Sequence, residues 1–197
     1  MTINQQDILN SILESLDRID YIKPKEIPNI DLYMDQVTTF MEEHLNASKR
    51  YPEDKILTKT MLNNYAKNRL LPSPEKKKYS KEHMLLLIYI YYYKSILSIG
   101  DIQSLLEPLT DRYFHNEGEF NMQSIYEEVF SLEKEQVEKM KQDVTEKYET
   151  ASRIFPEAEA EDQEFLRIFS FICLLSFDVY VKKQVIEKLI DELPKKS

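Results

Sequence analysis

The segment from Thr58 to Lys78 carries the side chains of this chain best suited to bind a charged, hydrogen-bonding partner. On a helix, five of them fall on one strip at spacings of one, three and four: Lys59, Thr60, Asn63, Asn64 and Lys67. Amide and ammonium groups hydrogen-bond to base edges in the major groove of DNA, and threonine and lysine bind phosphates. This amide-lysine strip contains no acid, whereas surface helices usually mix both signs. The pattern therefore favours a polyanionic partner.

Positive charge is concentrated in the same part of the chain. The 197 residues have a formal net charge of −9, yet residues 47–81 hold ten basic and three acidic side chains, a net charge of +7. Lys76, Lys77 and Lys78 form a basic run within this segment. A local basic surface on an acidic molecule would bind a polyanion at one place and repel it elsewhere. On charge alone, a solvated loop that offsets acidic neighbours remains the alternative.

The scarcity of glycine excludes several nucleotide-binding classes. Gly100 and Gly118 are the only glycines, and neither lies in a G-x-x-x-x-G-K-[ST] or G-x-G-x-x-G pattern. Few glycines with abundant Leu, Glu, Lys, Ile and Met also favour helices over hairpins that need positive φ. We expect an all-α protein.

Residues for catalysis or metal binding are not grouped in the sequence. His44, His83 and His115 lack the close spacing of a zinc-binding helix, and no Ser/His/Asp or Cys/His set has motif support. Cys173 is the only cysteine, which rules out an intrachain disulfide and favours a reduced, cytoplasmic location. We expect no enzyme activity, cofactor, metal, signal peptide or membrane-spanning segment.

Apolar periodicity and capping residues predict the helices that position these side chains. Thr58 and Ser80 are good N-caps, and Ser98 with Asp101 resembles a capping box. Pro108 is expected to limit the helix that Ser98 opens. The expected helices span about residues 5–19, 31–46, 58–69, 81–97, 98–109, 122–155 and 165–193. The helix at 81–97 is apolar on most sides, which predicts the buried spine of its domain.

The polar residues 110–120 are the best domain boundary. We expect a DNA-binding domain over residues 1–112 and a helical region over 113–197 for dimerisation or effector binding. The helix at 165–193 is apolar around much of its circumference, and a large exposed apolar patch is uncommon on a soluble monomer. Self-association of the C-terminal third would cover it. Packing of this helix at the centre of one bundle is the alternative.

Three runs between Thr60 and Leu106 resemble MerR-type winged helix-turn-helix regulators. TMLNNYAKNRLLP, from Thr60, resembles their recognition helix and exit, "LRYYxxxGLLxP". KYSKE, from Lys78, resembles "RxYSxED" after their wing, and SIGDIQSLL, from Ser98, resembles "SLxEIxxLL". The whole chain is also similar to a bacterial family catalogued as domain of unknown function 1836, whose "LTKTM.NNY.KN.LLP" core corresponds to residues 57–72.

The resemblance implies a DNA-binding transcriptional regulator whose helix from Thr58 enters the major groove. The Arg-Tyr-Tyr run of the MerR-like proteins falls on Asn63, Asn64 and Tyr65, which adds Tyr65 to the expected contacts. The chain departs from that pattern at three places. Arg69 replaces the glycine before "LLP", residues 74–79 are short for a two-stranded wing, and residues 31–46 could act as the first helix only through a long turn.

These observations together predict a sequence-specific regulator of transcription that binds double-stranded DNA as a homodimer joined by its C-terminal helices. Lys76, Lys77 and Lys78 would contact phosphates that flank the site read by the helix. An all-helical protein-interaction or adaptor module, whose basic strip contacts an acidic protein, is the alternative. Weak binding of a random duplex at low salt would distinguish the two.

Overall fold

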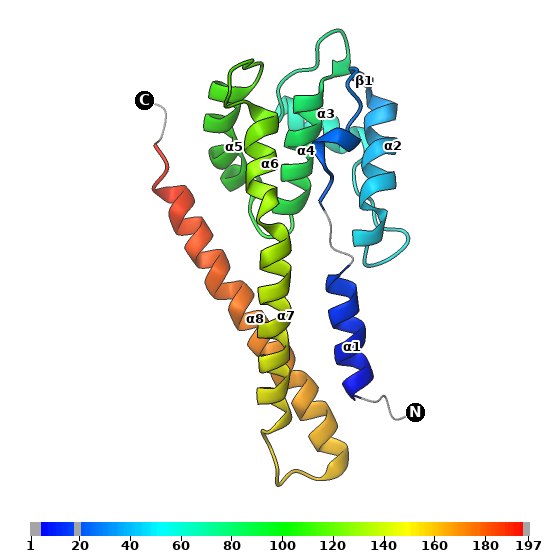
Figure 1. Cartoon of the computed structure of the whole chain (residues 1–197), viewed down its shortest axis with the longest axis vertical. Coiled ribbons are helices and arrows are strands. Elements are labelled where there is room, and N and C mark those ends of the chain that lie inside the picture. The colour runs from blue at the N-terminus through cyan, green and yellow to red at the C-terminus, as the bar shows by residue number, and fades with distance from the viewer. Residues whose placement is uncertain (1–4, 18–20, 195–197) are drawn as a thin grey trace. The chain divides into compact units, whose positions relative to one another are not determined.

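The computed structural model describes residues 5–17 and 21–194, and most of them are helical (Figure 1). The mostly helical composition confirms the all-α prediction. The elements, with two short 3-10 turns at Pro24–Glu26 and Asn46–Ser48, are α1 (Gln5–Leu16), β1 (Leu32–Tyr33), α2 (Met34–Leu45), α3 (Lys59–Lys67), β2 (Lys78–Tyr79), α4 (Lys81–Tyr93), α5 (Ile99–Tyr113), α6 (Met122–Ser131), α7 (Glu133–Ser152) and α8 (Ala160–Asp191).

The chain divides into two compact units. The first contains residues 5–17 and 132–186, and the second contains residues 21–131 and 187–194. The units therefore place the N-terminal helix with the C-terminal helices, and α6 with the segment that carries the amide-lysine strip.

The first unit packs α1 and α8 against α7. Its core contains four buried side chains, Leu9, Val144, Ala151 and Phe171, with partly buried apolar residues around them. An ion pair between Lys141 and Asp17 joins α7 to the residue after α1. Lys147 on α7 likewise pairs with Asp178 on α8.

The second unit is built around α4. Every side chain from His83 to Ile90 is buried, which confirms that this helix is a spine. Figure 1 shows α5 and α6 beside α4. Tyr126 of α6 is fully buried, and its hydroxyl donates a hydrogen bond to the carbonyl of Ile22 at 2.8 Å. The aromatic rings of Tyr89 and Tyr126 meet edge-on with centroids 5.4 Å apart.

The segment expected as a helix over residues 31–46 begins with a strand. Leu32 and Tyr33 form β1, which pairs antiparallel with β2 so that Leu32 lies opposite Tyr79 and Tyr33 opposite Lys78. The helix starts at Met34 because the backbone N–H of Tyr33 donates to the Gln36 side chain at 2.8 Å, which caps the first turn. Strand pairing thus replaces the first predicted turn of helix.

Other helix ends also differ from the prediction, since α4 ends at Tyr93 and not near residue 97, and α8 begins at Ala160 and not at residue 165. Pro108 does not end α5, which continues to Tyr113. Proline removes only the hydrogen bond to the carbonyl of Ser104, and Ser104 is exposed, so water can take that bond. The helix expected over residues 122–155 is divided into α6 and α7 at Leu132, where the two compact units also meet in the sequence. Residues 18 and 19 of the first expected helix lie outside the described part.

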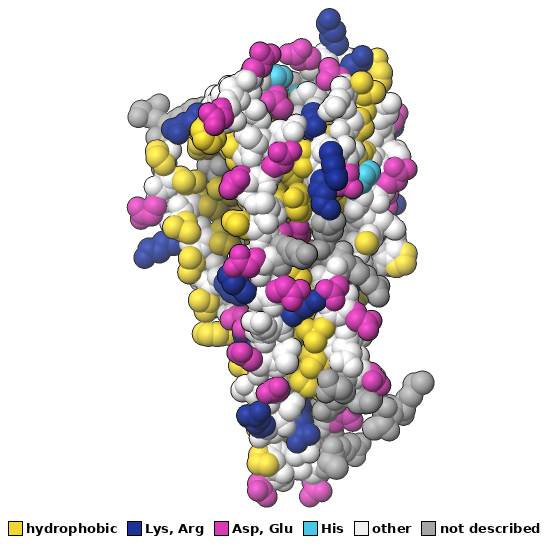
Figure 2. Space-filling model, viewed as in Figure 1, with side chains coloured by type: hydrophobic (Ala, Val, Ile, Leu, Met, Phe, Trp, Pro, Cys, Tyr) yellow, Lys and Arg dark blue, Asp and Glu magenta, His cyan; other side chains and the backbone are white. Residues whose placement is uncertain are grey.

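An apolar face of α8 is open to solvent. Eight of its large side chains have exposed fractions between 52% and 67%: Phe165, Phe169, Ile172, Phe177, Val179, Tyr180, Val185 and Leu189. Figure 2 shows hydrophobic side chains following α8 along the left edge of the molecule. Among the described helices, none combines the length and the apolar character needed to cross a membrane.

Candidate nucleic-acid interface

The helix α3 is fixed by a cap and by two buried side chains. Thr58 is its N-cap, as predicted, and its hydroxyl accepts a hydrogen bond from the backbone N–H of Met61 at 3.1 Å. Leu62 and Tyr65 are buried on the side that packs against α2. These contacts orient the opposite side of α3 toward solvent.

The amide-lysine strip occupies that exposed side. Lys59, Thr60, Asn63, Asn64 and Lys67 are all exposed. Thr60, Asn63, Asn64 and Lys67 follow the i, i+3, i+4, i+7 spacing of one helix face. Nine helical residues at a rise of 1.5 Å make α3 about 13 Å long, close to the ~12 Å width of a DNA major groove. The strip therefore has the exposure and the length that a groove contact needs.

One lysine of the strip already has an acidic partner. The Lys59 ammonium forms an ion pair with the carboxylate of Asp35 in the first turn of α2. Both side chains are largely exposed, at 62% and 72%. An exposed pair of this kind contributes only about 0–1 kcal/mol, because water solvates the separated charges well. Lys59 can exchange this partner at small cost.

Tyr65 does not belong to the exposed strip. Its side chain is 9% exposed and lies in the core of the second unit. Burial also raises the pKa of its hydroxyl. The expectation that Tyr65 touches DNA came from its alignment with the Arg-Tyr-Tyr run, but on α3 position 65 falls on the same side as Leu62. The structure therefore assigns Tyr65 to packing.

Arg69 ends α3 in the conformation that the MerR-like pattern gives to glycine. Its φ is 57°, in the left-handed region. The N–H of Leu70 donates to the carbonyl of Tyr65 at 2.9 Å, and the N–H of Arg69 donates to that of Ala66 at 3.2 Å. These two bonds make a Schellman cap with Arg69 at the position where glycine is preferred. The last carbonyls of α3 are therefore hydrogen-bonded, but Arg69 has a Cβ atom and is strained in the left-handed conformation.

The lysine run forms a tight two-residue turn. Lys76 and Lys77 have φ values of 49° and 65°. The N–H of Lys78 donates to the carbonyl of Glu75 at 2.8 Å, and these two residues also form a β-bridge. Positive φ at both central residues is the feature of a type I′ turn, in which Asn-Gly is preferred. Residues 74–79, which are short for a two-stranded wing, therefore form a minimal hairpin with two exposed lysines at its tip.

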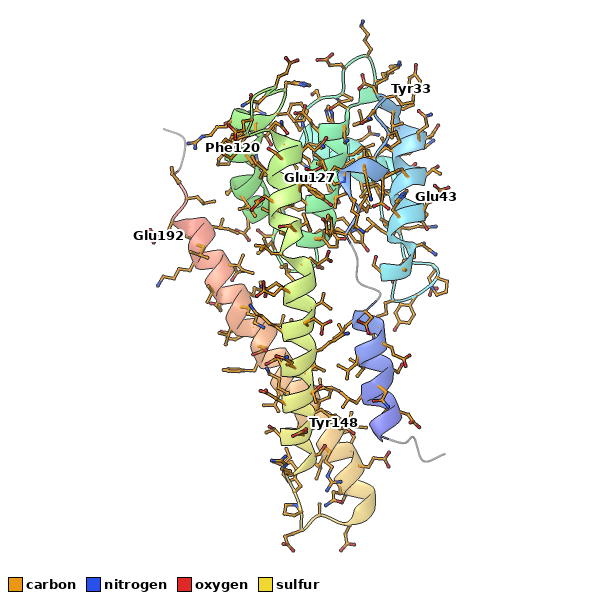
Figure 3. All side chains as sticks on the ribbon, viewed as in Figure 1. Tyr33, Glu43, Phe120, Glu127, Tyr148 and Glu192 are labelled. Atoms are coloured by element: carbon orange, nitrogen blue, oxygen red, sulfur yellow. The ribbon has the colours of Figure 1, made fainter. Side chains whose placement is uncertain are left out.

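Lys78 differs from its two neighbours because it is part of β2 and only half exposed. Its ammonium lies 5.2 Å from the centre of the Tyr33 ring on β1. Tyr33, labelled in Figure 3, is 54% exposed and stands at the start of α2. The cation–π contact and the strand pairing hold the lysine turn next to the N-terminus of α2.

The connection between α2 and α3 is long, as expected. Residues 46–58 link the two helices, whereas a compact helix-turn-helix uses a turn of three or four residues. Ile56 and Leu57 in this connection are buried, and Lys94, the residue after α4, donates to the carbonyl of Ile56 at 2.9 Å. The Ser48 and Tyr91 hydroxyls also form a hydrogen bond of 2.5 Å. The connection is therefore anchored on the spine helix.

Two acidic neighbours of the lysines were missed in the sequence interpretation. Asp35 reaches Lys59 only because α2 packs against α3. Glu75 was counted in the net charge, but its bridge to Lys78 depends on the turn. Tyr33 lies within the segment expected as a helix over residues 31–46, whereas the structure places it on β1 beside Lys78.

Among the described residues, no group of three His, Cys, Asp or Glu side chains lies close enough together to hold a metal ion. Cys173 is exposed on α8 and forms no disulfide in the part of the chain that is described.

Comparison with known proteins agrees with one part of the sequence interpretation. A family model described as "Domain of unknown function (DUF1836)" matches residues 22–129. That range begins before β1 and ends within α6, so it contains both strands, the strip and the spine helix. No curated protein and no solved structure matches the chain. Since the match spans more than half of the sequence, the chain belongs to the DUF1836 family.

Proposed function

We propose that this protein is a sequence-specific DNA-binding regulator of transcription that inserts α3 into the major groove. The observation that carries the proposal is the amide-lysine strip, whose five exposed side chains include two amides, a hydroxyl and two cations but no acid. Asn63 and Asn64 would read base edges, since an asparagine amide can bond adenine N6 and N7. Thr60 and Lys67 would bind phosphates beside them.

The lysine turn would contact the backbone that flanks the groove. Lys76 and Lys77 are exposed, and neither forms an ion pair with the residues that the structure describes. Glu75 is the acidic neighbour nearest in sequence. Two exposed cations at the tip of a short hairpin support this role, which is the one that a MerR-like wing would have. Their role is electrostatic and would not depend on the base sequence.

The salt dependence of DNA binding depends on which lysines are exposed and have no partner within the protein. Lys67, Lys76 and Lys77 are exposed and unpaired among the described residues, while Lys59 is paired with Asp35 and Lys78 lies over Tyr33. If three lysines each neutralise one phosphate, the slope of log K against log salt is about −2.7 per bound subunit. A slope near zero would contradict a phosphate contact.

The direct test is the anisotropy of a fluorescein-labelled random duplex at low salt, followed by selection of bound sequences from a randomised pool. We expect weak binding of the random duplex and enrichment of a defined motif. Lys67→Gln should weaken binding of every duplex, whereas Lys188→Gln on α8, with the same loss of charge, should have a smaller effect. Absence of binding at low salt would favour the protein-interaction module instead.

A second test separates base reading from phosphate binding. Asn63→Ala and Asn64→Ala should each reduce the preference for the selected duplex over a scrambled one, by roughly 1–3 kcal/mol for a bidentate contact. Lys77→Gln should weaken both duplexes equally. Equal losses on both duplexes for the asparagine variants would contradict their assignment to base edges.

We propose that two chains associate through the exposed apolar face of α8. Phe169 and Phe177 of α8 are 52% and 66% exposed, and large exposed apolar patches are uncommon on a soluble monomer. A dimer would present two copies of α3 to one DNA duplex. Phe169→Glu with Phe177→Glu should shift the sedimentation coefficient to that of a monomer. Phe120→Glu in the second unit (Figure 3), at an equally exposed phenylalanine, should not.

A further inference from the structure

The first unit contains a partly enclosed apolar cavity. It lies among α1, α7 and α8 and has a volume of about 270 Å³. Its lining includes Ile8 and Ile12 of α1, Tyr148 and Ala151 of α7, and Arg167 and Phe171 of α8. Figure 3 labels Tyr148 near the lower end of α7. Almost all of the surface that faces the cavity is carbon.

The cavity arises from the shapes of three neighbouring side chains. The rings of Tyr148 and Phe171 meet edge-on, with centroids 5.5 Å apart and an interplanar angle of 83°. Ala151, one turn along α7 from Tyr148, is buried but has only a methyl group. The lining also includes Ile172 of α8, which is 55% exposed, so the space opens to solvent on that side.

Arg167 gives the cavity its chemical character. Its Nε atom is buried and has no hydrogen-bond partner among the described residues. The structure also records no ion pair for its guanidinium within the described part, whereas Lys141 and Lys147 on α7 both pair with acids. Because the surface that faces the cavity is almost entirely carbon, the aliphatic part of the Arg167 side chain forms its share of the wall.

We propose that this cavity binds an amphipathic monocarboxylate, with the alkyl or aryl part inside and the carboxylate on Arg167. An unpartnered guanidinium beside a carbon-lined space is complementary to one anionic group joined to an apolar body. An apolar cavity of ~150 Å³ takes benzene, so this one has room for roughly ten heavy atoms. Octanoate has that size, and the site is separate from the proposed DNA contact.

The charge of the guanidinium distinguishes this ligand class from a neutral apolar one. A neutral alcohol of the same length would fill the space, and its hydroxyl could accept one hydrogen bond from Arg167 without a charge to pair with the guanidinium. A carboxylate would accept charge-assisted hydrogen bonds from the same group. We therefore expect octanoate to bind more tightly than octanol, by about fivefold, as for one partly solvated ion pair.

Calorimetric titration of the full-length chain with octanoate and with 1-octanol tests the proposal. We expect one octanoate per chain and the fivefold preference over octanol. Arg167→Gln should remove the preference by weakening octanoate alone. Arg153 is the exposed residue that follows α7, and Arg153→Gln should leave the affinity for both ligands unchanged. Ala151→Leu should fill the cavity and weaken both ligands at least tenfold.

Several results would overturn the proposal. It is wrong if octanoate fails to bind, if octanol binds equally well to the unaltered chain, or if Arg167→Gln leaves the preference intact. Dissociation of a dimer as octanoate binds would show that a second copy fills the space instead. Thermal melting by circular dichroism establishes that Ala151→Leu is folded, and if it is not, the Arg167→Gln comparison alone decides.

Discussion

Lys59 at the start of α3 forms an ion pair with Asp35 in the first turn of α2. The pair places an acid within reach of the amide-lysine strip, although the strip itself contains none. Because both side chains are largely exposed, the pair contributes little to stability. Its consequence is for binding, since Asp35 competes with any phosphate for the same ammonium group.

Asp35→Asn should therefore strengthen DNA binding. Removal of the carboxylate frees Lys59, so the slope of log K against log salt should become steeper by about 0.9. Glu43→Gln, at an exposed acid of the same helix (Figure 3), makes the same change in net charge and is the control. Anisotropy titrations at several salt concentrations measure both. Identical slopes for the two variants would show that Lys59 does not reach phosphate.

The lysine turn predicts opposite effects on stability and on binding. Lys76→Asn with Lys77→Gly places the preferred type I′ residues where two lysines now have positive φ. Relief of that strain should raise the free energy of unfolding by about 1–3 kcal/mol. The loss of two cations should make the salt slope of DNA binding less steep by about 1.8.

Chemical denaturation and anisotropy on the same preparation test the two effects. A variant that is more stable and binds less DNA supports a functional reason for the lysines. Unchanged DNA affinity would assign the lysines to a solvated turn without a DNA contact.

Arg69→Gly should stabilise the end of α3. Arg69 occupies the left-handed position of a Schellman cap, where glycine has no Cβ penalty. We expect the free energy of unfolding to rise by about 1 kcal/mol, after the entropy that glycine adds to the unfolded chain is taken into account. Urea unfolding gives this value. Lys67→Gly, inside the helix, is the control and should lower stability by about 1 kcal/mol.

His83 predicts a loss of stability in mild acid. The ring is 1% exposed, and its Nδ1 accepts a hydrogen bond from the Ser80 N–H at 3.0 Å. Burial, with a smaller contribution from the charge on His115, lowers the pKa of His83 from 6.5 to about 4. The nearby Pro72 and Ser73 carbonyls and Asp31 raise it, but only in part.

Because the folded pKa is below the unfolded one, the unfolded chain binds this proton more readily between pH 6.5 and 4. The stability that neutral His83 provides is complete above about pH 6.5 and is lost as the pH falls toward 4. From pH 7.5 to 4.5, the chain should lose about 2 kcal/mol more than the variant His83→Gln. Glutamine keeps the acceptor for Ser80 but does not titrate. His115→Gln, at an exposed histidine, should retain most of the loss, and urea unfolding at both pH values gives the comparison.

Local chemistry in the sequence was sufficient for several elements. Thr58 caps α3, and Ser98 and Asp101 form the capping box that opens α5. The apolar run in α4 predicted a buried spine, because a helix without a polar face must be covered on all sides. The exposure of the strip also followed from its spacing. These features depend on neighbours within one helix, so the sequence contains the information directly.

Tertiary structure decided the features that depend on neighbours far apart in the chain. The strand at Leu32 and Tyr33 forms because β2, more than forty residues away, supplies its hydrogen bonds. Asp35 meets Lys59 because α2 packs on α3 across a long connection. Tyr65 is buried although its alignment indicated a contact surface. The cavity beside Arg167 requires three helices from both ends of the sequence. Helical periodicity fixes the direction of a side chain on its own helix, but packing free energy over the whole unit selects what that side chain meets.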